Sequence, residues 1–374
     1  MRIGFDAKRA FFNHSGLGNY SRTLISQLCS LFPENDYVLF SPKESNGFKA
    51  FPPTNSSILY PKAFPFKKFP SLWRSFYMGR SIAKQDIRIF HGLSNELPMD
   101  IKKSNARSVV TIHDLIFLRY PNLYKRADRA IYRSKFQQSC NMADAVVAIS
   151  EQTKADIVDF LNISPEKIHV IYQGCSPLYY ERTAQETKNR IRAKHCLPRE
   201  YMLYVGTIEE RKNLLQLVKA KQEHKIELPL VVIGRQTPYY EKVKTYIEQV
   251  NMKGVYFLKN LEQEELPGIY QMAELFLYPS SFEGFGIPIL EALNSGIPVI
   301  AGAGGCMEET GGRGSIYVNP MKTEEIAESI HRVLNNPDLK SSMVSEGLKH
   351  AAYFREDRTA SEMMKLYKKI VTNE

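Results

Sequence analysis

Short runs of β-branched and aromatic residues recur along this chain, separated by longer segments with helical periodicity. This alternation predicts parallel strands joined by crossover helices, and therefore an α/β fold. In the first half we expect strands at residues 2–6, 37–40, 87–90, 108–112, 145–149 and 168–171. The pattern then starts again, with strands at 202–205, 230–233, 255–258, 275–278 and 299–300. Two doubly wound units are predicted.

The chain is long enough for two domains, because 374 residues exceed what one hydrophobic core usually serves. The best boundary is the polar stretch at 174–199, which contains Gly174 and Pro198. We therefore expect domains at 1–175 and 198–352. In open α/β sheets ligands bind outside the carboxyl ends of the strands, so two such sheets facing each other would form an interdomain cleft.

Hydrophobic residues make up 43% and charged residues 24% of the chain, which is typical of a folded globular protein. No window approaches the ~20 apolar residues of a membrane span, and the first residues carry charges where a secretory signal needs an apolar run. We expect a cytoplasmic location. The five cysteines are scattered without metal-ligand or redox spacing, so we expect reduced thiols and no metal site.

The formal net charge of +10 lies in the first half of the chain. Residues 1–180 carry 24 basic and 14 acidic side chains, whereas residues 181–374 carry 26 of each. A field of one sign on one domain predicts an anionic partner, such as a phosphorylated acceptor, a membrane surface or nucleic acid. We do not expect nucleic acid, because no known nucleic-acid-binding motif is present.

The most informative segment follows the strand at 275–278, where a glycine-bearing loop leads into a helix. Gly284 and Gly286 let backbone N–H groups approach a ligand closely, and such a helix start attracts anions and oxygen-rich groups. Glu291, in the first turns of this helix, can accept hydrogen bonds from a vicinal diol, and Glu283 lies in the preceding loop. The alternative is that Glu283 is a surface charge and Glu291 only interacts favourably with the helix dipole.

A second strand-to-helix turn follows the first strand of the second half and runs from Gly206 to two adjacent cations, Arg211 and Lys212. Cations at a helix N-terminus oppose its dipole, so an anion such as a diphosphate is a natural partner. These two side chains would then stabilise a departing nucleotide. The alternative is a solvated pair neutralised by Glu209 and Glu210.

Two weaker candidates lie in the first half. Gly16 and Gly18 stand at the start of a helix, where glycines permit close backbone contact with a phosphate; a simple helix cap is the alternative. His113 directly follows a strand and could transfer a proton near neutral pH, unless it is a structural imidazole held by a neighbouring carbonyl. His91 is a similar but weaker candidate.

Four features together resemble glycosyltransferase family 4 in order and spacing over almost the whole chain. They are the Gly16-Leu17-Gly18 loop, His113, the Val205-Gly206-Thr207 turn with Arg211-Lys212-Asn213, and the Glu283-x7-Glu291 segment. The resemblance implies the GT-B architecture, in which two Rossmann-like domains face each other across an interdomain cleft. It also implies a retaining transfer of a hexosyl group from a nucleotide sugar, without a metal or another cofactor.

The same resemblance implies a role for each site residue. Arg211 and Lys212 would bind the diphosphate, Glu291 the ribose, Glu283 the hydroxyls of the donor sugar, and the amides of Gly284, Phe285, Gly286 and Ile287 the sugar and phosphate. Gly16 would close over the diphosphate, Gly18 and Gly206 would contact the donor, and His113 would sit beside the donor sugar. Residues 353–358 also resemble the family's last segment, which implies a helix at 353–374 that returns to the N-terminal domain.

We expect the acceptor, a glycan or a lipid-linked glycan, at the N-terminal domain. Residues 61–77 interleave basic and aromatic side chains, and no acidic residue occurs at positions 61–85. This composition suits an anionic membrane surface that carries a lipid-diphosphate-linked glycan, with the protein peripheral on the inner face of the membrane. A second basic cluster includes Arg126, Arg129 and Arg133. The alternative is a solvated basic face beside core aromatics.

Family members of this kind often transfer mannose from GDP-mannose, and we expect this donor. No carboxylate stands out as the nucleophile of a double displacement. We therefore expect a same-face substitution in which the leaving diphosphate helps to deprotonate the acceptor. Two other classes stay open: a sugar-nucleotide epimerase of the same architecture, and a polyanion-binding or nucleic-acid-binding protein.

Overall fold

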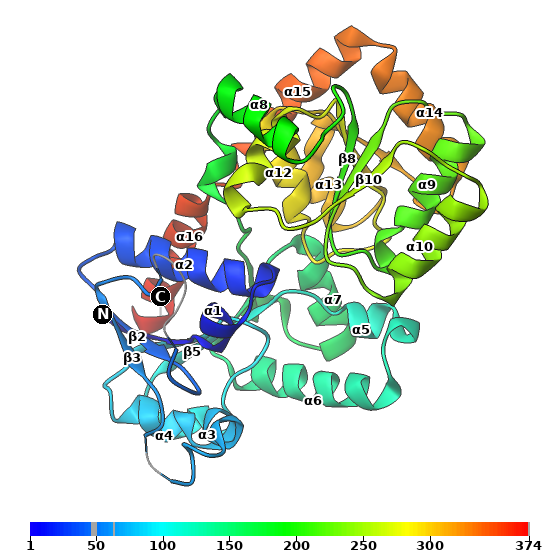
Figure 1. Cartoon of the computed structure of the whole chain (residues 1–374). Helices are drawn as coiled ribbons and strands as arrows, with labels where there is room; N and C mark the ends of the chain where they lie inside the picture. Colours follow the sequence, from blue (N-terminus) through cyan, green and yellow to red (C-terminus); the bar gives the residue numbers. More distant parts are fainter. Residues whose placement is uncertain (46–50, 63, 373–374) are drawn as a thin grey trace. The chain divides into compact units, whose positions relative to one another are not determined.

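The computed structural model describes residues 1–45, 51–62 and 64–372. The chain forms two compact units (Figure 1), and the first combines Met1–Gln173 with Glu356–Glu374. The second unit is Gly174–Arg355. The polar stretch that separates the two expected domains therefore packs within the second unit, and the chain re-enters the first unit at Glu356.

In the described part of the first unit, seven parallel strands form one sheet in the order β3-β2-β1-β4-β5-β6-β7. The strands are β1 (Arg2–Asp6), β2 (Asp36–Phe40), β3 (Ser56–Leu59), β4 (Ile89–Gly92), β5 (Arg107–Ile112), β6 (Ala145–Ala148) and β7 (Ile168–Val170). The strand order reverses between β1 and β4, and in such sheets ligands bind at the carboxyl ends beside this reversal.

Helices cover both faces of this first sheet. They are α1 (Lys8–Phe12), α2 (Gly16–Leu31), α3 (Pro70–Phe76), α4 (Met78–Ala83), α5 (Ile116–Arg119), α6 (Arg126–Met142), α7 (Glu151–Leu161) and α16 (Glu356–Thr372). The last helix, α16, packs on α2, as Figure 1 shows with red beside blue. Buried side chains of α2 and α16 share one core with Phe5, whereas Trp73 of α3 and Phe136 of α6 share the opposite core with Phe90.

The second unit, all of whose residues are described, holds a six-stranded parallel sheet in the order β10-β9-β8-β11-β12-β13. Its strands are β8 (Met202–Val205), β9 (Leu230–Ile233), β10 (Val255–Leu258), β11 (Leu275–Tyr278), β12 (Val299–Gly302) and β13 (Ser315–Val318). Its helices are α8 (Gln185–Lys194), α9 (Leu214–Glu223), α10 (Pro238–Gln249), α11 (Leu266–Gln271), α12 (Ile287–Ser295), α13 (Cys306–Gly311), α14 (Thr323–Leu334) and α15 (Pro337–Ala351). Here the strand order reverses between β8 and β11.

The predicted class of two doubly wound α/β units is confirmed. Two strands were missing from the prediction, β3 and β13, and both lie at sheet edges. Edge strands are buried less completely, and the exposed or half-buried serines and isoleucines of these two break the apolar run that marks a central parallel strand. Across the described ranges, no helix is long and apolar enough to cross a membrane.

Candidate active site

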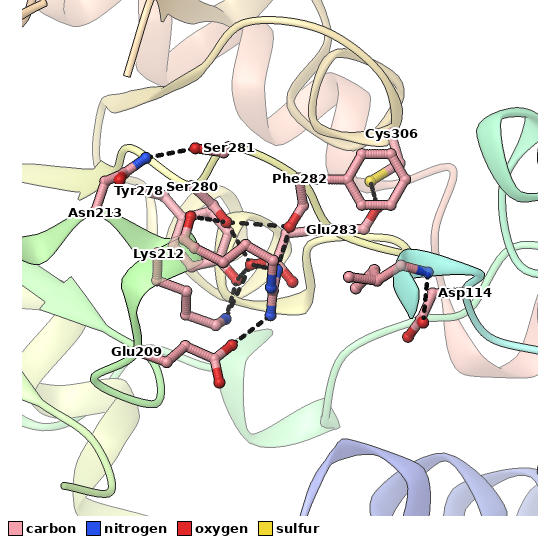
Figure 2. Close-up of polar contacts among 12 residues, drawn as sticks. Asp114, Glu209, Lys212, Asn213, Tyr278, Ser280, Ser281, Phe282, Glu283 and Cys306 are labelled. Atoms are coloured by element: carbon pink, nitrogen blue, oxygen red, sulfur yellow. Dashed lines mark hydrogen bonds and ion pairs between the residues drawn. The ribbon is translucent and has the colours of Figure 1, made fainter. Parts of the chain in front are cut away.

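The loops that follow β8 and β11 meet at the reversal of the second sheet. Asn213 ends a short 3-10 turn in the left-handed region, with φ 52°. Its side-chain amide donates to the carbonyl of Pro279 at 3.1 Å and to Ser281 Oγ at 2.6 Å, a bond visible in Figure 2. The amide of Ser281 in turn donates to the carbonyl of Arg211 at 2.8 Å. These bonds fix the two loops to each other and so orient the cations between them.

Arg211, Lys212 and Glu283 form a buried ion-pair cluster. Arg211 Nη1 lies 2.8 Å from Glu283 Oε1, and Lys212 Nζ lies 3.0 Å from the same oxygen. The three side chains are only 11–13% exposed, so the charges are largely removed from water. Arg211 also pairs with Glu209 at 2.6 Å and donates to the carbonyl of Phe282. Figure 2 shows the carboxylate of Glu209 turned toward this cluster.

Tyr278 and Ser280 complete the cluster. Lys212 Nζ donates to the Tyr278 hydroxyl at 2.7 Å, and this hydroxyl donates to Glu283 Oε1 at 2.9 Å. Lys212 Nζ also lies 4.8 Å from the centre of the Tyr278 ring, a favourable cation–π distance. Ser280 Oγ donates to Glu283 Oε1 at 2.7 Å. Sequence reasoning missed both residues, although Tyr278 is the only polar-tipped side chain of its strand and stands at the carboxyl end.

The electrostatics of the cluster are balanced. Burial alone would raise the pKa of Glu283, but Lys212 and Arg211 outweigh it and lower this pKa to about 2. Burial opposes the charge of Arg211 too, yet Glu283 and Glu209 raise its pKa. Two cations therefore face two carboxylates at neutral pH. The alternative interpretation has Arg211 and Lys212 solvated and neutralised by Glu209 and Glu210. The ion pair between Arg211 and Glu209 agrees with part of it, but the burial of the two cations and their ion pairs with Glu283 do not.

Gly206 and Gly286 shape the two loops in different ways. A Cβ on Gly206 would lie 3.2 Å from Lys212 Cδ, so the glycine leaves room for the lysine stem. Gly286 precedes α12 with φ +117°, a conformation that L side chains rarely adopt. It turns the chain from the Glu283 loop into the helix that begins at Ile287.

Glu291, on α12, has partners different from those of Glu283. Its carboxyl accepts a hydrogen bond from the Tyr270 hydroxyl at 2.8 Å. Burial raises the pKa of Glu291 to about 7, although hydrogen bonds from Tyr270 and Tyr179 partly offset this effect. The Glu291 carboxyl already accepts hydrogen bonds from two phenol hydroxyls, so it is chemically suited to accept hydrogen bonds from the hydroxyls of a ligand.

The remaining residues of the Glu283 loop are held by the protein itself. The Phe285 side chain is buried, and its ring meets that of Phe354 edge-on with 5.8 Å between centres. The Phe285 carbonyl accepts from Thr310 Oγ1 at 2.8 Å, and the Glu283 carbonyl accepts from Cys306 Sγ at 2.9 Å. The expected contacts of the Gly284, Phe285, Gly286 and Ile287 amides with a ligand stay predictions.

In the first unit, Gly16 and Gly18 begin α2 after Ser15. The Gly18 amide donates to Ser15 O at 2.9 Å and to Asn13 Oδ1 at 3.2 Å, so it is engaged within its own loop. A Cβ on Gly18 would come within 1.9 Å of the Asn13 carbonyl oxygen, whereas one on Gly16 would meet nothing within 4 Å. Close backbone packing thus explains Gly18, and the donor contacts of both glycines stay predictions.

His113 is a buried, neutral imidazole. Its Nε2 donates to the Leu93 carbonyl at 2.9 Å, and its ring meets that of Tyr20 edge-on at 4.8 Å. Burial lowers its pKa to about 4, so the ring is uncharged at pH 7 and does not act as an imidazolium acid. The contact with the Leu93 carbonyl agrees with a structural imidazole held by a neighbouring carbonyl. A contact of His113 with the donor sugar stays a prediction. His91 is fully buried, with both ring nitrogens bonded to Tyr367 and Thr111.

Two family models match the chain in succession. Residues 14–177 match the model described as glycosyltransferase family 4, and residues 186–350 match the model of glycosyl transferases group 1. The chain belongs to glycosyltransferase family 4. The resemblance stated from the sequence is therefore confirmed.

Two similar proteins are O-antigen chain mannosyltransferases. The O-antigen chain mannosyltransferase B of Escherichia coli is 26% identical over 98% of this chain and 100% of its own length. The O-antigen chain mannosyltransferase RfbU of Salmonella typhimurium is 27% identical over 61% of each chain. Family membership and these relatives establish a glycosyltransferase.

Solved structures establish the GT-B fold. The sucrose-phosphate synthase of Thermosynechococcus elongatus superposes over 100% of both chains with a TM-score of 0.81 at 20% identity. WaaG, a glycosyltransferase involved in lipopolysaccharide biosynthesis, covers 98% of this chain and 99% of its own, with a TM-score of 0.74 at 14% identity. The Anabaena protein Alr3699/HepE, solved with UDP-glucose, covers 98% and 99% with a TM-score of 0.77 at 14% identity.

Proposed function

We propose that this glycosyltransferase moves a mannosyl group, with retention, from GDP-mannose to a glycan or lipid-linked glycan. The observation that carries the proposal is the buried Arg211–Lys212 pair at the reversal of the second sheet, where α/β proteins bind their ligands. The choice of mannose is supported by the relative that spans the whole chain, an O-antigen chain mannosyltransferase.

The donor's diphosphate binds to Arg211 and Lys212 in this proposal. Glu209 is 36% exposed and is the more exposed of the two carboxylates paired with Arg211, so a phosphate oxygen can replace it at the guanidinium. Lys212 keeps its bond to Tyr278 and is thereby aimed by a fixed hydroxyl. Because the cluster is desolvated, each contact to the phosphate is stronger than it would be in water.

The other donor contacts follow the expected roles. Glu291 accepts the ribose hydroxyls, as it accepts the Tyr270 hydroxyl in the structure. Glu283 and the amides of Gly284, Phe285, Gly286 and Ile287 bind the hexose and phosphate, beside Gly206. Gly16 closes over the diphosphate, Gly18 contacts the donor, and His113 contacts the sugar as a neutral group.

The chemistry is a substitution on one face of the sugar. A pKa of about 2 and the ion pairs to Arg211 and Lys212 make the Glu283 carboxylate a weak nucleophile, so it does not form a glycosyl-enzyme intermediate. The bond from C1 to the diphosphate oxygen breaks, the acceptor oxygen bonds to C1 on the same face, and its proton passes to the leaving diphosphate. Arg211 and Lys212 stabilise the charge that develops there, without a metal.

The first unit carries the acceptor and faces an anionic membrane in this proposal. Large apolar side chains over a third exposed gather on and near α3 and belong to Phe64, Phe69, Leu72, Phe76 and Met99. They lie within or near the predicted basic and aromatic segment, of which Ala63 falls outside the described residues. Such side chains beside lysines suit the interface of an anionic bilayer on the cytoplasmic side. Binding to vesicles with and without anionic lipid tests this; equal binding contradicts it.

A donor panel tests the main proposal. Unfolding midpoints are measured with GDP, UDP, ADP and their hexose derivatives, since the nucleotide bound most tightly raises the midpoint most. GDP-mannose should give the largest rise, and incubation with an acceptor should yield an α-mannoside detectable by NMR. A larger rise with UDP-glucose, or an inverted product, contradicts the donor or the stereochemistry. Donor alone should yield no epimer, and a chelator should leave the rate unchanged.

A further inference from the structure

A cavity of about 440 Å³ lies at the carboxyl edge of the first sheet. This volume is within the range of small-molecule sites, about 300–1,000 Å³. Its walls come from the segments after β1 and β2 and from α3 and α6; the residues are Lys8, Phe12, Pro42, Lys43, Pro70, Ser71, Arg74, Ser75 and Lys135. A smaller cavity shares Arg74, Ser75 and Lys135 and continues to the segment after β4. Both adjoin the reversal of strand order between β1 and β4.

Arg74 is held rigidly in the wall of both cavities. It pairs with Asp6 at 2.6 Å and with Glu96 at 2.7 Å, and it is only 11% exposed. Lys135 lies 3.3 Å from the other oxygen of Glu96. Burial opposes the charge of Arg74, but the two carboxylates outweigh it and raise the pKa of this side chain. Arg74 is therefore a fixed and neutralised part of the scaffold.

Lys8 and Lys43 bring positive charge that no ion pair of the described residues neutralises. Lys43 Nζ lies 5.0 Å from the centre of the Phe12 ring, and in the described part of the chain neither lysine forms an ion pair. Burial, together with Arg74 and Arg9, lowers the pKa of Lys8, although Glu96 and Asp6 partly offset this effect. The two cavities together are lined by four cations and two carboxylates, which leaves a surplus of two positive charges.

We propose that this cavity binds the phosphate group of a phosphate-bearing acceptor through Lys8, Lys43 and Lys135. A phosphate monoester carries close to two negative charges at pH 7, which matches the surplus, whereas one sugar carboxylate would offset only half of it. The placement at the carboxyl edge beside the reversal agrees with a ligand site. That the ligand is the acceptor rests on the proposed glycosyl transfer; that the cavity takes a phosphate does not.

The phosphate can come from a lipid-linked glycan or from a water-soluble sugar phosphate. Phe76 and Met99 line the smaller cavity and are 48% and 41% exposed, so an apolar surface adjoins the cationic one. Two probes separate the sources: mannose 6-phosphate, and a short-chain polyprenyl diphosphate-linked hexose in detergent micelles. If the lipid probe binds more tightly, its tail uses this apolar surface.

Calorimetric binding of each probe, without donor, tests the site. The double variant Lys8→Ala/Lys43→Ala should weaken binding of at least one probe by about 10- to 100-fold, because two charge-assisted contacts are lost. The matched control Lys102→Ala/Lys369→Ala removes the same charge from two exposed lysines of the first unit that lie outside residues 61–85 and do not line the cavity. It should bind like the wild type, and an unchanged unfolding midpoint and GDP response verify that both variants fold.

The outcomes separate this site from the proposed activity. The phosphate site is overturned if neither probe binds the wild type, or if the control variant loses as much affinity as the cavity variant. A wild-type chain that binds a probe through Lys8 and Lys43 but transfers nothing from GDP-mannose supports the phosphate site and contradicts the proposed function. If both hold, the cavity variant should also raise the acceptor KM and leave the donor KM unchanged.

Discussion

The two units hold their cations in opposite ways. In the second unit, Arg211 and Lys212 are buried and matched by Glu209 and Glu283. In the first unit, the cavity beside β1 has a surplus of two positive charges, and Lys8 is exposed enough to be reached from solvent. A balanced cluster keeps its geometry without a ligand, whereas a surplus is relieved only when an anion arrives. Under the two proposals, the second unit offers a preorganised donor site, and the first unit offers an acceptor site that the substrate completes.

The largest effect is expected at Arg211 and Lys212. Alanine at either position should lower kcat/KM by about 100- to 1,000-fold, because each side chain stabilises the charge on the leaving diphosphate. Each change also leaves buried Glu283 with one cation fewer, so the unfolding midpoint should fall as well. Steady-state kinetics with GDP-mannose at a temperature well below that midpoint measure the effect. If both variants turned over at nearly the wild-type rate, Arg211 and Lys212 would have no catalytic role. The balanced cluster of the second unit would then not be a donor site, and the comparison with the first unit would fail.

The balanced cluster should lose stability in acid. The pKa of Glu283 is about 2 in the folded chain against 4.5 ordinarily, so its contribution is fully present above pH 4.5 and is lost as the pH falls toward 2. The full contribution is on the order of 3 kcal/mol. Denaturant unfolding of wild type and Glu283→Gln measures it: the difference in unfolding free energy should shrink as the pH is lowered through this window. A constant difference would show that the cluster does not hold Glu283 ionised.

Glu291 should respond to pH in the opposite direction. Its pKa is about 7 when folded against 4.5 ordinarily, so between these values the folded chain holds a proton that the unfolded chain has lost. Stability therefore falls as the pH rises from 4.5 to 7. Glu291→Gln should raise the unfolding midpoint at pH 8 relative to wild type and do so less at pH 5. It should also weaken GDP binding, and a variant that binds GDP normally would remove the ribose role.

The smallest effect is expected at Glu209. If this exposed carboxylate competes with the donor's diphosphate for Arg211, Glu209→Gln should tighten GDP binding by about two- to fivefold, as a partly exposed ion pair allows. Glu210→Gln is the matched control, since Glu210 is the neighbouring carboxylate. Isothermal titration of GDP measures both. Weaker binding by Glu209→Gln would mean that this carboxylate positions Arg211 rather than competing for it.

Edge position alone does not decide whether a strand is predicted: the edge strands β7 and β10 were predicted, whereas the edge strands β3 and β13 were not. The boundaries of β8 to β11 agree with the prediction to the residue, because these strands form apolar runs between turn signals. The edge strands β3 and β13 lack such a run. Pairing and order could not be read from periodicity, since they depend on which strand each crossover helix returns to.

The two candidate sites also differ in how well the sequence predicts them. Arg211, Lys212 and Glu283 were predictable because each stands in a loop between a strand and a helix. Tyr278 was not, because a tyrosine that ends an apolar strand is indistinguishable from a core residue. The surplus of positive charge in the cavity of the first unit was visible in the sequence only as the net charge of residues 1–180. Lys8 and Lys43 are distant in sequence, and it is the pairing of β1 with β2 that brings the ends of these strands together.

Helix α16 has a consequence for biosynthesis. It supplies Met363, Met364 and Tyr367 to the same core as α2 and β1, and the Tyr367 hydroxyl lies 2.6 Å from His91 Nδ1. The first unit is therefore assembled from two segments that are separated in sequence by the whole second unit. During translation, the part of α2 that packs on α16 stays uncovered until residues 356–372 have been synthesised. A helix made early thus reaches its final packing only after the second unit has been synthesised.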